Sequence, residues 1–403
     1  MRVNPGASGY SLGRRRWWLL LLLLPVMTGC WGRQEVNDIG IVTATAVDRS
    51  DNGDIVVMLL FAIPRLVGTS SMTGGGGESK MSTTAGWVVT AGGETVMDAF
   101  RNIQAKLPRT IYFSHNRVLL LGERLAREGI APVLDVFQRN RQSQLNSFVL
   151  VAEHPEDILR FKPTFEKLSS EIIEEEIVRG VGTNVRLVEF LAMLHAEGQE
   201  AFAPVVELTK STEKKNGSNL RATTKTAAFR GDRLVGLLGD EATRGLVWLR
   251  NEVRDGVITI QVPESRGGGK ISAEIKSGST RFRPSVRDGR VRIRIETEAT
   301  LDIAENASKM EIERHLGTVE SYFERDLEER LRALCDKVQR NLHTDIVGFG
   351  QSLYRNDPKR WRGEYAERWD ETFPNVRADI SVSVQVLNTG LVGKRVDIWE
   401  EER

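Results

Sequence analysis

Cysteine is almost absent from this chain, which has only Cys30 and Cys335 among its 403 residues. Two thiols form at most one disulfide, so the multiple disulfides that hold many small secreted proteins together are excluded. Apolar residues make up 40% of the chain and charged residues 28%, which is ordinary for a folded protein. We therefore expect the fold to be held together by packing.

Patterns that signal catalysis or metal binding are also missing. No Gly-x-Ser-x-Gly motif occurs, and the glycine tracts Gly74–Gly77 and Gly267–Gly269 lack the spacing of a phosphate-binding loop. The histidines are scattered, and none lies at a metal-ligand spacing from another histidine, a cysteine or an acid. We predict no catalytic residue, no metal site and no cofactor; a carboxylate pair assembled only by folding is left open. The five histidines are His115, His154, His195, His315 and His343.

An excess of charge of one sign is lacking as well. The formal net charge is +1, and four of the 56 basic residues fall within residues 1–29, which contain no acid. The rest of the chain therefore carries slightly fewer basic than acidic residues. Nucleic-acid binding requires a concentrated positive charge, so we predict no nucleic-acid partner.

Long hydrophobic runs are limited to one, near the N-terminus. Arg14–Arg16 precede the apolar run Trp17–Met27, whose 11 residues fall short of the roughly 20 that span a membrane. A basic segment followed by a short apolar run is typical of an export signal. Two small residues then precede Cys30, as a protease that cuts before a lipid-modified cysteine requires. We predict that residues 1–29 are a lipoprotein signal peptide, cleaved between Gly29 and Cys30, and that Cys30 is acylated. The alternative is an ordinary secretory signal with an incidental cysteine.

The length that remains predicts several domains with an α+β fold. We expect a mixed α/β N-terminal domain over residues 30–204. The apolar runs Ile39–Val47 and Ile55–Ile63 predict a hairpin that must be covered on both faces. Ile111–Leu121 is predicted to be one strand, and Pro155–Gly198 to be mostly helical.

A small β-rich middle domain is expected over residues 205–270. Its apolar runs are short and are separated by turn residues. Arg230–Asp232 spells a cell-adhesion tripeptide, but we interpret it as a tight turn between two strands.

Residues 271–403 show the clearest pattern. Apolar and polar residues alternate around Val291–Ile295 and Ile380–Val386, which predicts strands with one wet face. Between them, apolar residues recur at spacings of three or four. We predict a domain in which a helix from about Ala307 to Asn341 packs on a mainly antiparallel sheet. The apolar stripe consists of Ile312, Leu316, Val319, Phe323, Leu327, Leu331, Leu334, Val338 and Leu342.

Short sequence motifs spread along the chain resemble the spore germination lipoproteins of the Ger(x)C type, in order and at similar spacing. The residues that carry the resemblance are Gly29-Cys30-Trp31, Glu35-Val36-Asn37-Asp38, Ile41-Val42, Leu107-Pro108-Arg109, Tyr112-Phe113-Ser114-His115, Gly122-Glu123, Leu125-Ala126-Arg127-Glu128-Gly129, Ala228-Phe229, Asp232-Arg233-Leu234-Val235-Gly236, Thr243-Arg244-Gly245-Leu246-Val247-Trp248-Leu249, Asp345-Ile346-Val347-Gly348-Phe349-Gly350, Pro358-Lys359, Trp361, Trp369 and Phe373-Pro374.

The resemblance implies a lipid-anchored C subunit of a nutrient germinant receptor, on the outer face of the spore inner membrane. Its implied partners are a membrane-embedded A subunit and a transporter-like B subunit. No enzymatic activity is implied, and Cys30, as the acylation site, is the one functional residue that transfers. Two rival hypotheses stay open: a free-standing lipid-anchored solute-binding protein, which would have two similar lobes around a cleft, and an extracytoplasmic hydrolase of the cell envelope. Which nutrient is sensed, and whether this subunit contacts it, does not follow from the sequence.

Overall fold

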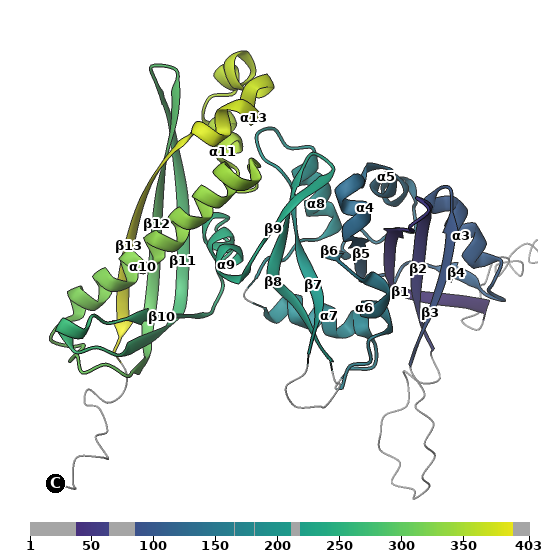
Figure 1. The fold of residues 1–403 in the computed structure, drawn as a ribbon, viewed down its shortest axis with the longest axis horizontal. Helices are drawn as coiled ribbons and strands as arrows, with labels where there is room; N and C mark the ends of the chain where they lie inside the picture. Colours follow the sequence, from purple (N-terminus) through teal and green to yellow (C-terminus); the bar gives the residue numbers. More distant parts are fainter. Residues whose placement is uncertain (1–37, 64–84, 165, 181, 211–217, 390–403) are drawn as a thin grey trace, which may run out of the picture.

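The computed structural model describes residues 38–63, 85–164, 166–180, 182–210 and 218–389. These residues form a nine-stranded sheet and, later in the chain, a four-stranded sheet. Figure 1 shows the two sheets, each with its own helices, following one another along the longest axis of the molecule. The predicted α+β class is confirmed, with a mixed α/β N-terminal part and a C-terminal sheet packed by a long helix.

The first sheet has parallel strands at its centre and antiparallel strands on either side. Its order is β3-β2-β1-β5-β6-β7-β8-β9, and β4 pairs with β1 off this path. The predicted hairpin is present, because β1 and β2 pair antiparallel with Arg49 opposite Ile55. The strands are β1 (Ile39–Arg49), β2 (Ile55–Ala62), β3 (Gly86–Gly93), β4 (Thr110–Tyr112), β5 (Val118–Gly122), β6 (Phe148–Ala152), β7 (Phe202–Lys210), β8 (Ser218–Arg230) and β9 (Arg233–Leu238).

Helices cover both faces of this sheet, as its apolar strands require. Alternate residues of one strand therefore enter two separate cores: Leu59 packs in the larger core and Leu60 in the smaller one. The helices of the larger core are α3 (Val96–Gln104), α4 (Glu123–Glu128), α5 (Ala131–Arg139) and α8 (Leu187–Leu194). Those of the smaller core are α6 (Pro155–Arg160) and α7 (Ser169–Arg179).

Two predictions for this region differ from the structure. Ile111–Leu121 is not one strand, because the chain turns at Asn116, whose N–H donates to the carbonyl of Phe113. Residues 205–270 do not form a sheet of their own. Their first strands, β7 to β9, extend the nine-stranded sheet, and β10 (Val257–Gln261) belongs to the four-stranded one. The physical reason is strand pairing, since β6 offers a free edge to β7.

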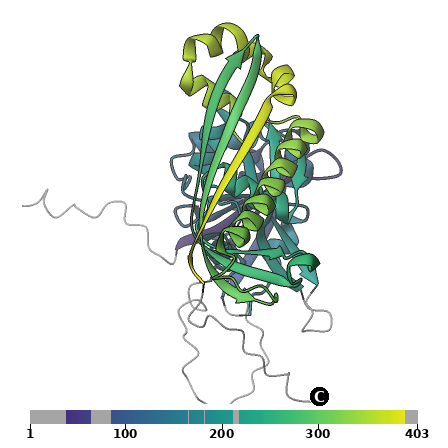
Figure 2. The same ribbon diagram turned by 90° about the vertical axis from the view of Figure 1, so that its left-hand side faces the viewer.

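The second sheet is packed by one long helix, α10 (Leu316–Asp336), which contacts α9 and lies along β13 (Figures 1 and 2). The apolar stripe is buried from Val319 to Val338, so the predicted helix face is confirmed. Strands β10, β11 and β12 pair antiparallel, whereas β12 and β13 pair parallel. The remaining elements are α9 (Asp240–Leu249), β11 (Lys270–Arg287), β12 (Arg290–Asn306), α11 (Phe349–Asn356), α12 (Pro358–Arg360), α13 (Trp369–Thr372) and β13 (Arg377–Asn388).

The long helix starts later than predicted, at Leu316 rather than Ala307. Asn306 and Ser308 form side-chain hydrogen bonds with each other and with Met310, which stabilise a turn in place of a helix. At its other end α10 continues as a π-helical turn, Lys337–Leu342. Within the described ranges, none of the helices combines the length and the apolar character needed to cross a bilayer.

Candidate functional site: the junction of the two sheets

The two sheets meet at a buried contact that includes many of the motif residues. We call it the junction and define it by the loop 196–200, the turn 230–232 and the segment 342–350. Its centre is the carboxylate of Asp345, which is 2% exposed. This carboxylate accepts hydrogen bonds from the backbone N–H groups of Gly348 (2.8 Å), Phe349 (3.0 Å) and Gly350 (2.8 Å). It also accepts one from Nε1 of Trp369, at 2.9 Å.

These four donors explain why a charged group is tolerated at such a place. The first turn of α11 leaves its N–H groups without partners in the helix, and the carboxylate satisfies them. Burial nevertheless raises the pKa of Asp345 from 3.8 to about 6, and the donated hydrogen bonds oppose this rise only in part. Asp345 therefore organises the start of α11 at a cost in desolvation.

Two glycines let the backbones of the two halves touch. The N–H of Gln351 donates to the carbonyl of Gly198 at 2.6 Å, and the N–H of Glu200 donates to the carbonyl of Asp345 at 2.9 Å. Gly198 has φ +74°, and a Cβ added there would lie 2.4 Å from the carbonyl carbon of Gly350. A Cβ added to Gly350 would lie 2.6 Å from the ring of Trp369, so neither glycine position has room for a side chain.

The turn between β8 and β9 belongs to the first sheet and forms hydrogen bonds with the other segments of the junction. Arg230 donates from its guanidinium to the carbonyls of Leu342 and His343, at the end of the π-helical turn. The N–H of Gly231 donates to Oε2 of Glu200 at 2.7 Å. Asp232 accepts from the N–H of Ala131 at the start of α5, at 3.2 Å. The tripeptide is thus the tight turn that the sequence predicts, and its side chains serve internal contacts.

Aromatic rings pack behind Asp345. The ring centroids of Trp361 and Trp369 are 5.2 Å apart, and that of Phe373 lies 6.2 Å from Trp369. Nε1 of Trp361 donates to Oε2 of Glu197 in the facing loop, at 2.7 Å. The C-terminal tryptophans therefore connect α11, α12 and α13 to the first half of the molecule.

The helix α9 lies between the two sheets in Figure 1 and forms the second contact between the halves. A Cβ added to Gly245 would lie 3.4 Å from Leu334 of α10, so the two helices pack closely. Trp248 packs over Gly278 of β11, where an added Cβ would lie 2.5 Å from its ring. Among the described residues, this helix and the junction both hold the two sheets together.

A cleft of about 780 Å³ opens beside α9, between α8 and the start of the second sheet. Arg250 lies in its wall, where its guanidinium donates to Oε1 of Gln199 at 3.0 Å and stacks 5.5 Å from the centroid of Phe202. Burial raises the pKa of Glu252, which lines the same cleft next to Arg250. The two sheets on either side are unlike in size and topology.

The predicted site residues Gly29 and Cys30 lie outside the described residues. In the part of the chain that the structure describes, no three His, Cys, Asp or Glu side chains come together as metal ligands. Cys335 lies in the core beside the stripe, and burial raises the pKa of its thiol to about 12. Asp345 belongs to one of the motifs that carry the family resemblance, but the sequence alone predicts no structural role for it.

Comparison with known proteins gives matches over nearly the whole chain. Residues 32–208 match the family described as spore germination protein N-terminal domain. Residues 224–390 match the family described as spore germination B3/GerAC like, C-terminal.

Individual relatives and a solved structure agree with these matches. The chain is 28% identical to the putative spore germination protein YfkR of Bacillus subtilis (strain 168), over 92% of this chain and 95% of that protein. It is 25% identical to the spore germination protein KC of the same organism, over 91% and 93%. The crystal structure of the GerBC protein superposes with a TM-score of 0.55 at 18% identity, covering 86% of this chain and 97% of that one. The chain thus belongs to the Ger(x)C family of spore germination proteins.

Proposed function

We propose that this protein is a lipid-anchored, non-enzymatic C subunit of a spore nutrient germinant receptor. The observation that carries the proposal is the match of both halves of the chain, in order, to spore germination proteins. In this proposal the protein acts with membrane-embedded A and B subunits, and its part is to assemble or stabilise the receptor.

The proposed anchor is a diacylglyceryl group on Cys30. Residues 1–29 carry the pattern of a lipoprotein signal, and Ile39, where β1 begins, follows Cys30 by nine residues. Two acyl chains give stable anchoring, whereas a single chain holds a protein only reversibly. Confinement to the outer face of the spore inner membrane also raises the effective concentration for assembly with membrane-embedded partners.

The tied arrangement of the two sheets supports a role in assembly. Asp345, Arg230 and the glycine pair hold the two halves in one relative position, which suits a protein that presents surfaces to two partners at once. The side chains of the junction contact one another, so they stabilise the arrangement of the two halves. The partner subunits would then bind other, exposed surfaces of the protein.

A second candidate is a free-standing lipid-anchored solute-binding protein. The cleft of about 780 Å³ favours it, because small-molecule sites have volumes of roughly 300–1,000 Å³. The unlike sheets on either side of the cleft favour the receptor subunit, since a solute-binding protein of the expected kind has two similar lobes.

Affinity purification from spore inner membranes separates the two candidates. We expect the A and B membrane subunits to co-purify with this protein after mild detergent extraction. A lipoprotein of unrelated function from the same membrane serves as the control. Recovery of this protein without integral membrane partners, together with saturable binding of a small solute, would overturn the receptor proposal.

A further inference from the structure

One face of the second sheet is strongly basic, and none of the described elements covers it. Near the β11–β12 hairpin the strand residues alternate: Phe282, Val291 and Ile293 turn toward the core, and residues of the opposite face, such as Arg283 and Arg292, are exposed. The exposed positions carry seven arginines, which we call the arginine face. They are Arg281, Arg283, Arg287, Arg290, Arg292, Arg294 and Arg377.

Arginines on this face lie directly opposite one another on neighbouring strands. Arg283 is the partner of Arg294 across β11 and β12, and Arg287 is the partner of Arg290 at the hairpin end. Arg292 is likewise the partner of Arg377 across β12 and β13. Like charges directly opposite in a sheet are destabilising, so the arrangement does not serve the stability of the fold.

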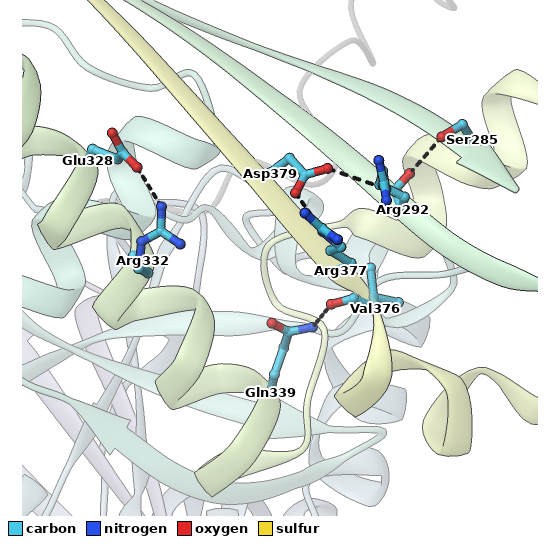
Figure 3. A network of polar contacts seen from close by, with 8 residues as sticks. All are labelled: Ser285, Arg292, Glu328, Arg332, Gln339, Val376, Arg377 and Asp379. Carbon is cyan, nitrogen blue, oxygen red and sulfur yellow. Dashed lines mark hydrogen bonds and ion pairs between the residues drawn. The ribbon is translucent and has the colours of Figure 1, made fainter. Parts of the chain in front are cut away.

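Acidic side chains neutralise only part of this charge. Asp379 contacts Arg292 at 3.3 Å and Arg377 at 2.8 Å, and Figure 3 shows it between these two arginines. Glu296 pairs with Arg283 at 2.6 Å. Within the described ranges, the other four arginines of the face make no ion pair.

Exposed arginines elsewhere on the molecule are commonly paired within their own helix. Arg139 pairs with Asp135, and Arg179 pairs with Glu175, each four residues earlier. Figure 3 shows the same arrangement on α10, where Arg332 reaches Glu328. The arginine face departs from this pattern and concentrates positive charge in a chain whose overall charge is nearly balanced.

The shape and chemistry of the face indicate what it binds. Adjacent strands lie about 4.8 Å apart and outward residues along a strand about 7 Å apart, so the guanidinium groups form a two-dimensional array. The side chains between them, such as Ser285 and Ser381, are short, and no aromatic residue is present among them to stack on a base. Every cation is an arginine, whose planar fork binds phosphate through two parallel hydrogen bonds.

We propose that the arginine face docks on an anionic phospholipid surface by contacting its headgroup phosphates. A two-dimensional array of cations matches the two-dimensional array of phosphates on a bilayer surface, whereas a single acidic peptide would contact only one row of arginines. Docking at this face would fix the orientation of the second sheet relative to the membrane. It does not require the lipid at Cys30, so the two contributions are separable.

Vesicle flotation tests the proposal with residues 30–403 carrying Cys30→Ala, so that no acyl chain contributes. The probes are vesicles of phosphatidylcholine alone and vesicles in which a third of the lipid is phosphatidylglycerol. The test variant combines Arg281→Gln, Arg287→Gln, Arg290→Gln and Arg294→Gln. The matched control removes the same charge from helices elsewhere; it combines Arg101→Gln, Arg139→Gln, Arg179→Gln and Arg340→Gln.

We expect binding to the anionic vesicles only, and its loss when salt is raised from about 0.1 M to about 1 M. The test variant should bind at least about tenfold less tightly, because each basic residue near an anionic surface contributes roughly fivefold. The control variant should retain most of the binding. The test variant should unfold at the same temperature as the parent or higher, because repulsion between arginines is relieved.

Three results would overturn the proposal. One is equal vesicle binding by the test and control variants. Another is equal binding to neutral and anionic vesicles. The third is no binding to anionic vesicles at low salt, which would assign the face to an acidic protein partner.

Discussion

The substitution Asp345→Ala tests whether the junction is a main source of stability. It removes the acceptor of four buried donors, the N–H groups of Gly348, Phe349 and Gly350 and Nε1 of Trp369. A buried donor left without a partner costs about 1–3 kcal/mol. The substitution also removes a buried charge and its desolvation cost, which offsets part of the cost of the unpaired donors. We therefore expect the free energy of unfolding at pH 7 to fall by about 3–5 kcal/mol.

Urea unfolding followed by tryptophan fluorescence measures this loss, because Trp361 and Trp369 lie at the site. The matched control is Asp357→Ala. Its carboxylate also caps a helix start in the same half of the molecule, but it accepts one N–H, that of Arg360, at an exposed position. We expect about 1 kcal/mol there. Equal losses for the two variants would refute the conclusion that Asp345 organises the junction.

Three further predictions follow from burial and geometry. Because the pKa of Asp345 is raised to about 6, folding favours its protonated form. The stability of the wild type relative to Asp345→Asn should therefore be greatest below about pH 4 and fall by up to about 3 kcal/mol as the pH rises through 6. A difference in urea unfolding that does not change with pH would contradict the conclusion that burial raises this pKa. Leu327→Ala should lower the free energy of unfolding, measured by thermal unfolding, by about 2–5 kcal/mol, because this residue is 1% exposed. Leu387→Ala, at a residue that is 56% exposed, should change it by less than about 0.5 kcal/mol, and similar values for the two variants would show that the stripe faces elsewhere. Gly198→Ala should cost clearly more than Gly53→Ala in the same assay, since both have positive φ but only Gly198 touches another backbone, and equal costs would show that the contact is loose.

Patterns set by local periodicity are readable from the sequence alone. The buried stripe from Val319 to Val338 follows helical spacing, and the alternation around Val291–Ile295 follows strand spacing. The hairpin of β1 and β2 is likewise predicted by its apolar runs and the turn between them. In these elements the spacing of the apolar residues specifies both the type of secondary structure and the face that is buried.

Features that depend on contacts between distant segments were not predictable in this way. Pairing of β7 with β6 gives residues 205–210 to the first sheet, and no local pattern specifies that neighbour. The helix start at Leu316 depends on the turn that Asn306 forms with Ser308. The burial of Asp345 depends on Trp369, 24 residues later, so the residues around Asp345 do not by themselves predict an enclosed carboxylate.

We propose that this protein acts as a membrane-held subunit of a nutrient receptor. Nutrient-triggered germination of spores carrying Cys30→Ala, with the protein present at its normal level, tests it most directly. We expect a slower nutrient response than in wild-type spores, with the protein partly lost from the membrane and the response to a non-nutrient trigger unchanged. A nutrient response equal to that of the wild type would contradict it.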